Sequence, residues 1–177
     1  MATYKTPDVY VEEISLFPPS VAEVETAIPA FIGYTETALK KGVVDVKFKP
    51  TKIRSLADYR EIYGGEPPID VEKVEIDVNN VVVSSEVKAS YYMYDALRMF
   101  FGNGGGKCYI VSIGFFKDNN INKDHFVEGI QKLKKQDEPT ILLFPDAVLL
   151  SGKGLYAVQR QALSQCGNLG DRVAIFD

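Results

Sequence analysis

The glycine-rich segment Gly102-Asn103-Gly104-Gly105-Gly106-Lys107 has the composition of a phosphate-binding loop. Such a loop follows a strand and opens a helix, so that the amide groups of the helix face the anion. Here the pattern predicts the reverse order, with a helix before the glycines and a strand after them. We therefore interpret the segment as the end of a helix and a tight turn, and we predict no nucleotide and no other cofactor.

Two aspartates, Asp146 and Asp177, each follow a predicted strand, at the edge where α/β domains bind ligands. This placement is the one indication of an enzyme. The sequence has no G-x-S-x-G motif, and no nucleophile can be paired with a base. Aspartate after a strand is also a common helix cap or turn residue. We predict that role and no catalytic residue; a small α/β hydrolase or ligand-binding domain is the alternative hypothesis.

The sequence contains one histidine and two cysteines. His125 stands among charged residues near a predicted helix start, which is typical of a surface position, and a lone histidine is weak support for a metal site. Cys108 falls in a predicted buried strand and Cys166 near a helix end, where we interpret both as small hydrophobic side chains. The sequence therefore predicts no metal site.

The composition is that of a globular protein: 46% of the 177 residues are hydrophobic and 25% are charged, enough for one substantial core. The net charge of −4 argues against nucleic-acid binding, which needs clustered lysine and arginine. No apolar run approaches the roughly 20 residues that span a bilayer. No signal peptide is recognisable. We expect cytoplasmic synthesis, no direct membrane insertion and no disulfide framework.

Residues 21–89 are predicted to be mainly β structure with one short helix. The nearly continuous apolar run at 26–34 indicates a strand buried on both faces, whereas 43–53 alternates and indicates a half-buried strand. Ser55 is a suitable N-cap for a helix that Gly64-Gly65 would end. Two strands, at 71–78 and 81–87, are predicted to form a hairpin at Asn79-Asn80, because asparagine tolerates positive φ.

From Ser90 onward, predicted helices alternate with short apolar strands. The helices are expected at 90–101, from Asn122 or Asp124 to Lys135, and at 154–166, and the strands at 107–113, 140–144 and 172–176. This alternation predicts βαβ units with a parallel sheet and right-handed crossovers. On the middle helix, Phe126, Ile130 and Leu133 would share the buried face.

The predicted fold class is α/β in a mixed α+β arrangement of three parts. An extended N-terminal arm with a Pro-Pro spacer covers residues 1–20, a β-rich part covers 21–89, and a βαβαβ parallel-sheet unit covers 90–177. The last predicted strand would be an exposed apolar edge. We therefore expect the third part to be an incomplete domain, in a fragment or truncated form of a longer protein.

The N-terminal arm is the region where we expect contact with another chain. Residues 6–14 favour a strand, but the spacer that follows holds this strand away from 26–34, so its backbone groups need another sheet. The residues predicted to link subunits are Thr6, Pro7, Val9, Tyr10, Val11, Glu12, Glu13 and Ile14, and the predicted hinge or spacer residues are Phe17, Pro18, Pro19 and Ser20.

The N-terminal sequence TPDVYVEEI, followed by PPSVAEVETAIPAFIGYTE, resembles the N-terminus of contractile tail sheath proteins of phages and phage-tail-like injection systems. Asp8 stands where the family commonly has glycine. Three later segments, SLADYREIYGG, ALRMFFGNGGGKCYIVSI and EPTILLFPDA, also resemble the family in the same order. The resemblance extends over nearly the whole chain, and its specificity lies in the combination of segments.

The resemblance implies a structural protein and not an enzyme. Sheath subunits form hexameric rings that stack helically around an inner tube and contract to drive the tube through a target envelope. Arms of neighbouring subunits add strands to one another's sheets, and no cofactor is needed. The implied partners are other sheath subunits, the inner tube protein, and baseplate and terminal cap proteins. The implied location is the cytoplasm during assembly, and then a virion or a phage-tail-like particle that can be released from the cell.

Overall fold

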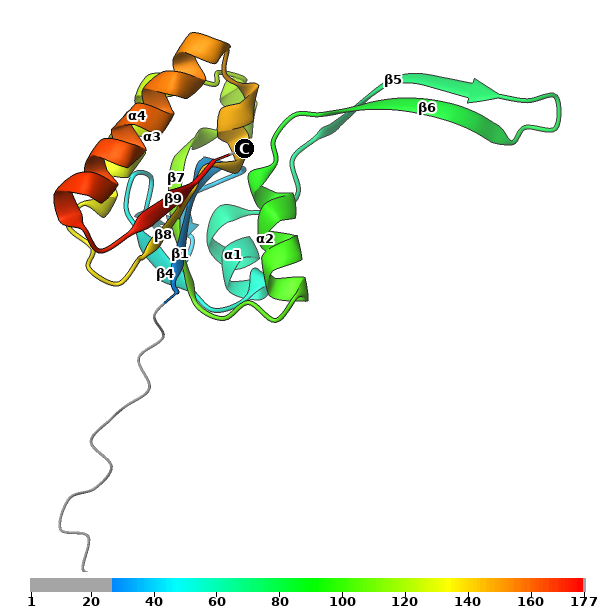
Figure 1. The fold of residues 1–177 in the computed structure, drawn as a ribbon. Helices are drawn as coiled ribbons and strands as arrows, with labels where there is room; N and C mark the ends of the chain where they lie inside the picture. Colours follow the sequence, from blue (N-terminus) through cyan, green and yellow to red (C-terminus); the bar gives the residue numbers. More distant parts are fainter. Residues whose placement is uncertain (1–26, 177) are drawn as a thin grey trace, which may run out of the picture.

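The computed structural model of the protein describes residues 27–176. It has a mixed α/β fold in which a five-stranded sheet carries helices on both faces (Figure 1). The sheet is formed by β1 (Pro29–Thr35), β4 (Thr51–Ile53), β7 (Cys108–Phe115), β8 (Ile141–Leu143) and β9 (Val173–Ile175). The helices are α1 (Leu56–Tyr63), α2 (Met93–Gly102), α3 (Lys123–Leu133) and α4 (Gly152–Leu169), with short 3-10 helices η1 (Phe116–Asp118) and η2 (Pro145–Leu149).

The strand order is β4-β7-β1-β8-β9, with β1 in the centre. β1 pairs in parallel with β7 and β8, β8 pairs in parallel with β9, and β4 runs antiparallel to β7 at the edge. The expectation that residues 90–177 form a parallel sheet by themselves is wrong, because β1 lies between β7 and β8. Strands from both predicted parts, 21–89 and 90–177, therefore share one sheet.

The seven residues of β1 are all buried, as predicted for a strand covered on both faces. Ala30, Ile32 and Tyr34 join the core beneath α3 and α4, whereas Phe31 joins the core beneath α1 and α2. On α3, the predicted apolar face of Phe126, Ile130 and Leu133 is fully buried in the first of these cores, which confirms the prediction. The sheet is thus the common wall of two apolar layers.

The helix ends follow the local signals in the sequence, with one exception. The Ser55 side chain accepts a hydrogen bond from the Asp58 N–H (3.1 Å), and Asn122 accepts one from the Asp124 N–H (2.9 Å), so both predicted N-caps are confirmed. Gly64 ends α1 with a φ of 87°. Gly167 and Gly170 were both predicted to end the last helix; α4 continues through Gly167 to Leu169 and ends at Gly170, which has a φ of 70°.

The predicted strand over 43–53 is also wrong as a single element. The segment contains β3 (Val44–Asp45), which pairs with β2 (Leu39–Lys40), and then β4. Phe48 interrupts the strand with a φ of 55°, a value that a continuous strand cannot contain. The interruption turns the chain back so that β4 can reach the edge of the main sheet.

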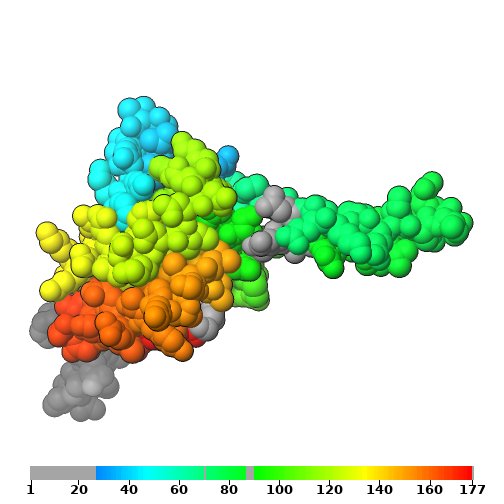
Figure 2. Space-filling model, turned by 90° about the horizontal axis from the view of Figure 1, so that it is seen from above, coloured from blue at the N-terminus to red at the C-terminus, as the bar shows by residue number. Residues whose placement is uncertain are grey.

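The predicted hairpin is confirmed as β5 (Ile69–Ile76) and β6 (Val82–Ala89). Its turn is held by Asp77, whose Oδ1 accepts hydrogen bonds from the N–H groups of Asn79 (2.8 Å) and Val81 (2.9 Å). Asn80 has the predicted positive φ, 61°. The hairpin projects from the body of the molecule as an isolated two-stranded arm (Figures 1 and 2).

Two helical glycines provide a matched test of the packing. A Cβ at Gly129 would lie 2.8 Å from Ile113 Cγ2 and 2.9 Å from Ile32 Cγ2, whereas a Cβ at Gly167 meets nothing within 4 Å. We expect Gly129→Ala to lower the free energy of unfolding by about 1–2 kcal/mol through overpacking. Gly167→Ala should raise it by about 0.5–1 kcal/mol through helix propensity. Urea denaturation measures both, and equal effects of the two substitutions would contradict the close packing of α3 on the sheet.

Candidate functional site

Asp146 is the residue on which the alternative hypothesis of a hydrolase or ligand-binding domain rests. It lies in η2 directly after β8 and is fully buried. Its Oδ2 accepts a hydrogen bond from the Tyr34 N–H (2.8 Å), and its Oδ1 accepts bonds from the N–H groups of Tyr92 (2.6 Å) and Met93 (3.1 Å). The carboxylate thereby joins β1 to the first turn of α2. The predicted cap or turn role is confirmed, although the capped groups belong to distant segments and not to the helix that follows.

Burial raises the pKa of Asp146 to about 6, against the opposing effect of the hydrogen bonds from Tyr34, Tyr92 and Met93. The backbone approaches the carboxylate so closely at Gly33 that a Cβ there would lie 2.5 Å from Oδ2 and 2.8 Å from Met93 Sδ. A carboxylate enclosed in this way has no open side toward a substrate. Its chemistry is used to hold the sheet and α2 together.

The side chain of Tyr34 extends this polar cluster toward α3. Its hydroxyl accepts a hydrogen bond from the Asn122 N–H (2.9 Å) and bonds to His125 Nδ1 (3.0 Å). Burial raises the pKa of Tyr34 to about 12, so the hydroxyl stays protonated at neutral pH. The prediction that His125 is a surface residue is wrong, because His125 is half-buried and holds the start of α3 against β1.

The glycine-rich segment has the predicted order: α2 ends at Gly102, the turn follows, and β7 begins at Cys108. The Gly104 N–H donates to the Phe101 carbonyl (3.1 Å) and the Gly105 N–H to the Phe100 carbonyl (2.9 Å). These amide groups therefore close the end of the preceding helix. They are not directed at an anion, as the amide groups of a phosphate loop are.

The remaining reactive side chains show no catalytic arrangement within residues 27–176. Cys108 is buried, as predicted, and burial raises the pKa of its thiol to about 12, which keeps it protonated. Cys166 is half-buried, and burial raises the pKa of its thiol as well. In the same residues, no group of three or more His, Cys, Asp or Glu side chains could hold a metal ion.

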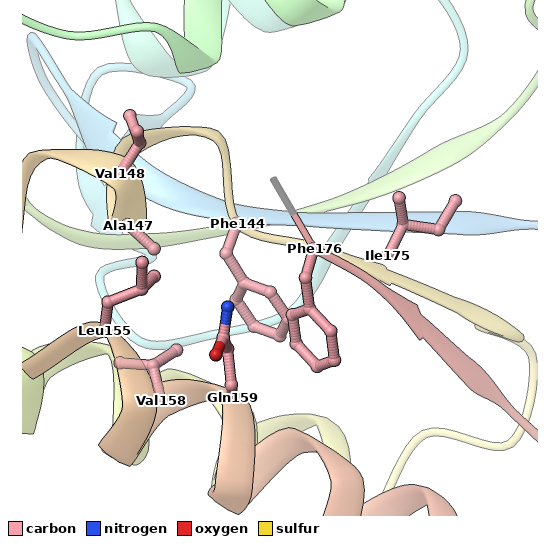
Figure 3. A pocket seen from close by; sticks show the side chains of 8 residues that line it. All are labelled: Phe144, Ala147, Val148, Leu155, Val158, Gln159, Ile175 and Phe176. Carbon is pink, nitrogen blue, oxygen red and sulfur yellow. The ribbon is translucent and has the colours of Figure 1, made fainter. Parts of the chain in front are cut away.

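The first of two open apolar surfaces lies at the edge of the sheet. β9 pairs with β8, and within the described part of the chain no strand pairs with its other side. Val173 is 59% exposed and Ile175 is 51% exposed. Figure 3 shows the shallow apolar pocket between this edge and α4, with the rings of Phe144 and Phe176 stacked at 6.3 Å. Its lining residues are Phe144, Ala147, Val148, Leu155, Val158, Gln159, Ile175 and Phe176.

The second open surface is the β5–β6 hairpin, where every side chain described from Ile69 to Glu86 is exposed. Its branched apolar residues, each at least half exposed, are Ile69, Val71, Val74, Ile76, Val78, Val81, Val82 and Val83. The sequence reasoning predicted the strands but missed that they stand away from the body. Charged residues alternating with apolar ones are equally typical of a strand with one face on a core, so the sequence carries no signal for this exposure.

The residues predicted to link subunits, at 6–14, and the hinge residues, at 17–20, lie outside the described residues, as does Asp177.

Comparison of the chain with models of protein families gives no match, and comparison with curated proteins gives none either. Among the residues that the structure describes, no helix has the length and apolar character needed to cross a membrane. Because the buried polar groups have structural partners, the candidate functional site is the pair of open surfaces, the β9 edge and the β5–β6 hairpin.

The buried Asp146 carboxylate predicts a pH dependence of stability. Because its pKa rises from 3.8 to about 6 on folding, the stability gained from its protonated form is fully present below about pH 4 and is lost as the pH rises through 6. Relative to Asp146→Asn, which does not titrate, the wild type should lose about 2–3 kcal/mol of unfolding free energy between pH 4 and 7. Urea denaturation at several pH values measures this difference, and a constant difference across the range would contradict the burial of an ionisable group here.

Proposed function

We propose that this protein is a structural subunit of a contractile tail sheath, which polymerises helically around an inner tube and contracts to drive the tube through a target envelope. The proposal rests first on the ordered resemblance of the sequence to sheath proteins. Residues that carry the resemblance also have clear roles in the fold: AIPAFIGYT contains the central strand β1, and LADYREIYGG forms α1 and its glycine end.

The structural observation that carries the proposal is the open edge of β9. An exposed strand edge presents unpaired backbone groups that favour pairing with another strand. Val173 and Ile175 stand exposed on this strand beside the apolar pocket of Phe144 and Phe176, so a strand added there would bury apolar surface as well as form ladder bonds. Strand addition between subunits is the linkage that the sheath hypothesis requires.

In this proposal the partners are neighbouring sheath subunits in stacked hexameric rings, the inner tube protein, and the baseplate and cap proteins at the two ends. The energy of contraction is stored in the subunit lattice during assembly, so the mechanism calls for rigid-body movement of subunits and for no cofactor. The protein would assemble in the cytoplasm and then form part of a virion or phage-tail-like particle.

The geometry argues against the alternative of a small hydrolase or ligand-binding domain. That hypothesis placed the chemistry at Asp146, but its two carboxylate oxygens are occupied by the N–H groups of Tyr34, Tyr92 and Met93. The apolar pocket beside β9 is lined by the neighbouring residues Phe144 and Ala147 and not by Asp146 itself.

The test of the proposal is the removal of the predicted arm from the full-length protein. Deletion of residues 1–16 should leave the body folded but prevent assembly of extended sheaths, because the arm supplies ladder bonds to a neighbour. Each such bond contributes only about 0.5–1.5 kcal/mol, but several are repeated at every link of the lattice. Tyr10→Pro should have the same effect by removing one donor within the predicted strand.

Tyr4→Pro is the matched control, since it introduces the same residue before the predicted strand begins. Circular dichroism should be unchanged in all variants, and electron micrographs should show sheaths only for the wild type and for Tyr4→Pro. Normal contractile sheaths from the deletion or from Tyr10→Pro would exclude the arm as the link between subunits.

A further inference from the structure

The β5–β6 hairpin is amphipathic, and two irregularities in its pairing keep it so. The register shifts once between Val71 and Lys73 and again between Glu75 and Ile76. Residues on one face of a strand recur at every second position, but the apolar residues Ile69, Val71, Val74 and Ile76 include one interval of three. The bulge after Val71 absorbs the extra residue, so that Val74 returns to the apolar face.

The opposite face of the hairpin is charged. The Lys73 ammonium lies 2.5 Å from the Glu75 carboxylate, and the Glu75 carboxylate also accepts a hydrogen bond from the Ser84 hydroxyl across the strands (3.0 Å). Over residues 69–89 the sequence has five acidic and two basic residues, a net charge of −3. The hairpin therefore combines an uncovered apolar face with a negative field.

A second exposed feature of the same molecule has the complementary properties. The segment 38–49, which contains β2 and β3, exposes Leu39, Val43 and Val44. It has four lysines and one aspartate, a net charge of +3. An apolar groove adjoins it, lined by Glu36, Thr37, Ala38, Leu39, Asp45, Lys47, Phe115 and Lys117.

Two lysines flank the aromatic wall of this groove. The ammonium groups of Lys47 and Lys117 lie 5.0 and 5.5 Å from the centre of the Phe115 ring. The two carboxylates of the lining already have partners within the molecule: Glu36 accepts the Gly65 N–H (2.6 Å), and Asp45 accepts the Lys47 N–H (2.8 Å). The groove is therefore apolar and neutral overall, and the excess positive charge lies on the adjoining segment 38–49.

The two features point in different directions from the body. Figure 2 shows the hairpin extending away from the body, while the segment 38–49, in blue to cyan, protrudes from another side. The hairpin of one molecule therefore does not cover the segment 38–49 of the same molecule. A second copy of the chain can bring the two together.

We propose that the β5–β6 hairpin of one copy docks its apolar face on the segment 38–49 and the adjoining groove of a second copy, and that the net negative charge of the hairpin favours its approach to the positive segment. The contact joins two different surfaces, so each bound copy still offers a free hairpin and a free segment, and the association continues into a ring or a helical array. This contact deepens the proposed function by naming an interface between subunits, but it requires only a second copy of the chain and does not depend on the N-terminal arm.

A charge-swap experiment with the full-length protein tests the contact. Glu75→Lys with Glu86→Lys changes the hairpin charge from −3 to +1, and Lys40→Glu with Lys47→Glu changes the segment charge from +3 to −1. Sedimentation velocity in about 50 mM salt should show self-association of the wild type that weakens as salt is added. Each double variant alone should associate about tenfold or more weakly, because its hairpin and its segment 38–49 then carry net charges of the same sign.

An equimolar mixture of the two double variants should regain wild-type association, since each altered surface then meets an altered partner. Lys134→Glu with Lys135→Glu, on exposed positions after α3, is the control for total charge and should associate as the wild type does. Rescue in the mixture would support the contact, because a difference in folding or in net charge cannot produce it.

Three results would overturn the contact. They are a wild type that stays monomeric at all concentrations, a mixture that fails to associate, and equal association of all the proteins. Equal association would assign the self-association to another region such as the N-terminal arm, and would leave the sheath proposal standing. Hairpin-dependent binding of a monomeric wild type to vesicles of phosphatidylcholine would instead assign the hairpin to a membrane surface.

Discussion

The position of β1 between β7 and β8 is the constraint on which the rest of the structure depends. Its seven residues are buried, and they contribute to the apolar cores on both faces of the sheet. The register with β7 shifts between Gly33 and Tyr34, and at this point the Tyr34 N–H turns to Asp146 Oδ2. The same carboxylate holds the start of α2, and the Tyr34 hydroxyl holds the start of α3 through Asn122. One strand therefore positions helices on both sides of the sheet.

This constraint explains why the polar groups most able to do chemistry have structural roles. Hydrogen bonds join Asp146 to the backbone of Tyr34 and the Tyr34 hydroxyl to His125. A buried polar group without such partners would lower the free energy of unfolding by about 1–3 kcal/mol. The uncovered apolar surfaces among the described residues include the β9 edge, the β5–β6 hairpin and the segment 38–49. Exposed apolar strands of this kind are a liability in a monomer and are useful in a protein that assembles.

Local features of the fold could be predicted from the sequence, and long-range ones could not. Ser55, Asn122 and Asn80 act within four residues of themselves, so their caps and turn follow from residue type. The interruption at Phe48 was missed because phenylalanine rarely adopts positive φ. The partners of Asp146 lie 112 and 53–54 residues away in the chain, and their identity depends on the strand order, which apolar periodicity does not specify. The exposure of the hairpin was missed for the same reason, since a run of valines fits a buried strand as well as an uncovered one.

The central claim is that the protein is a subunit of a helical assembly and not an enzyme with a closed site. Electron microscopy of the full-length protein, expressed alone and purified at high concentration, tests this claim most directly. The account predicts helical polymers. Compact monomers or closed dimers at every concentration, with no polymers, would contradict it.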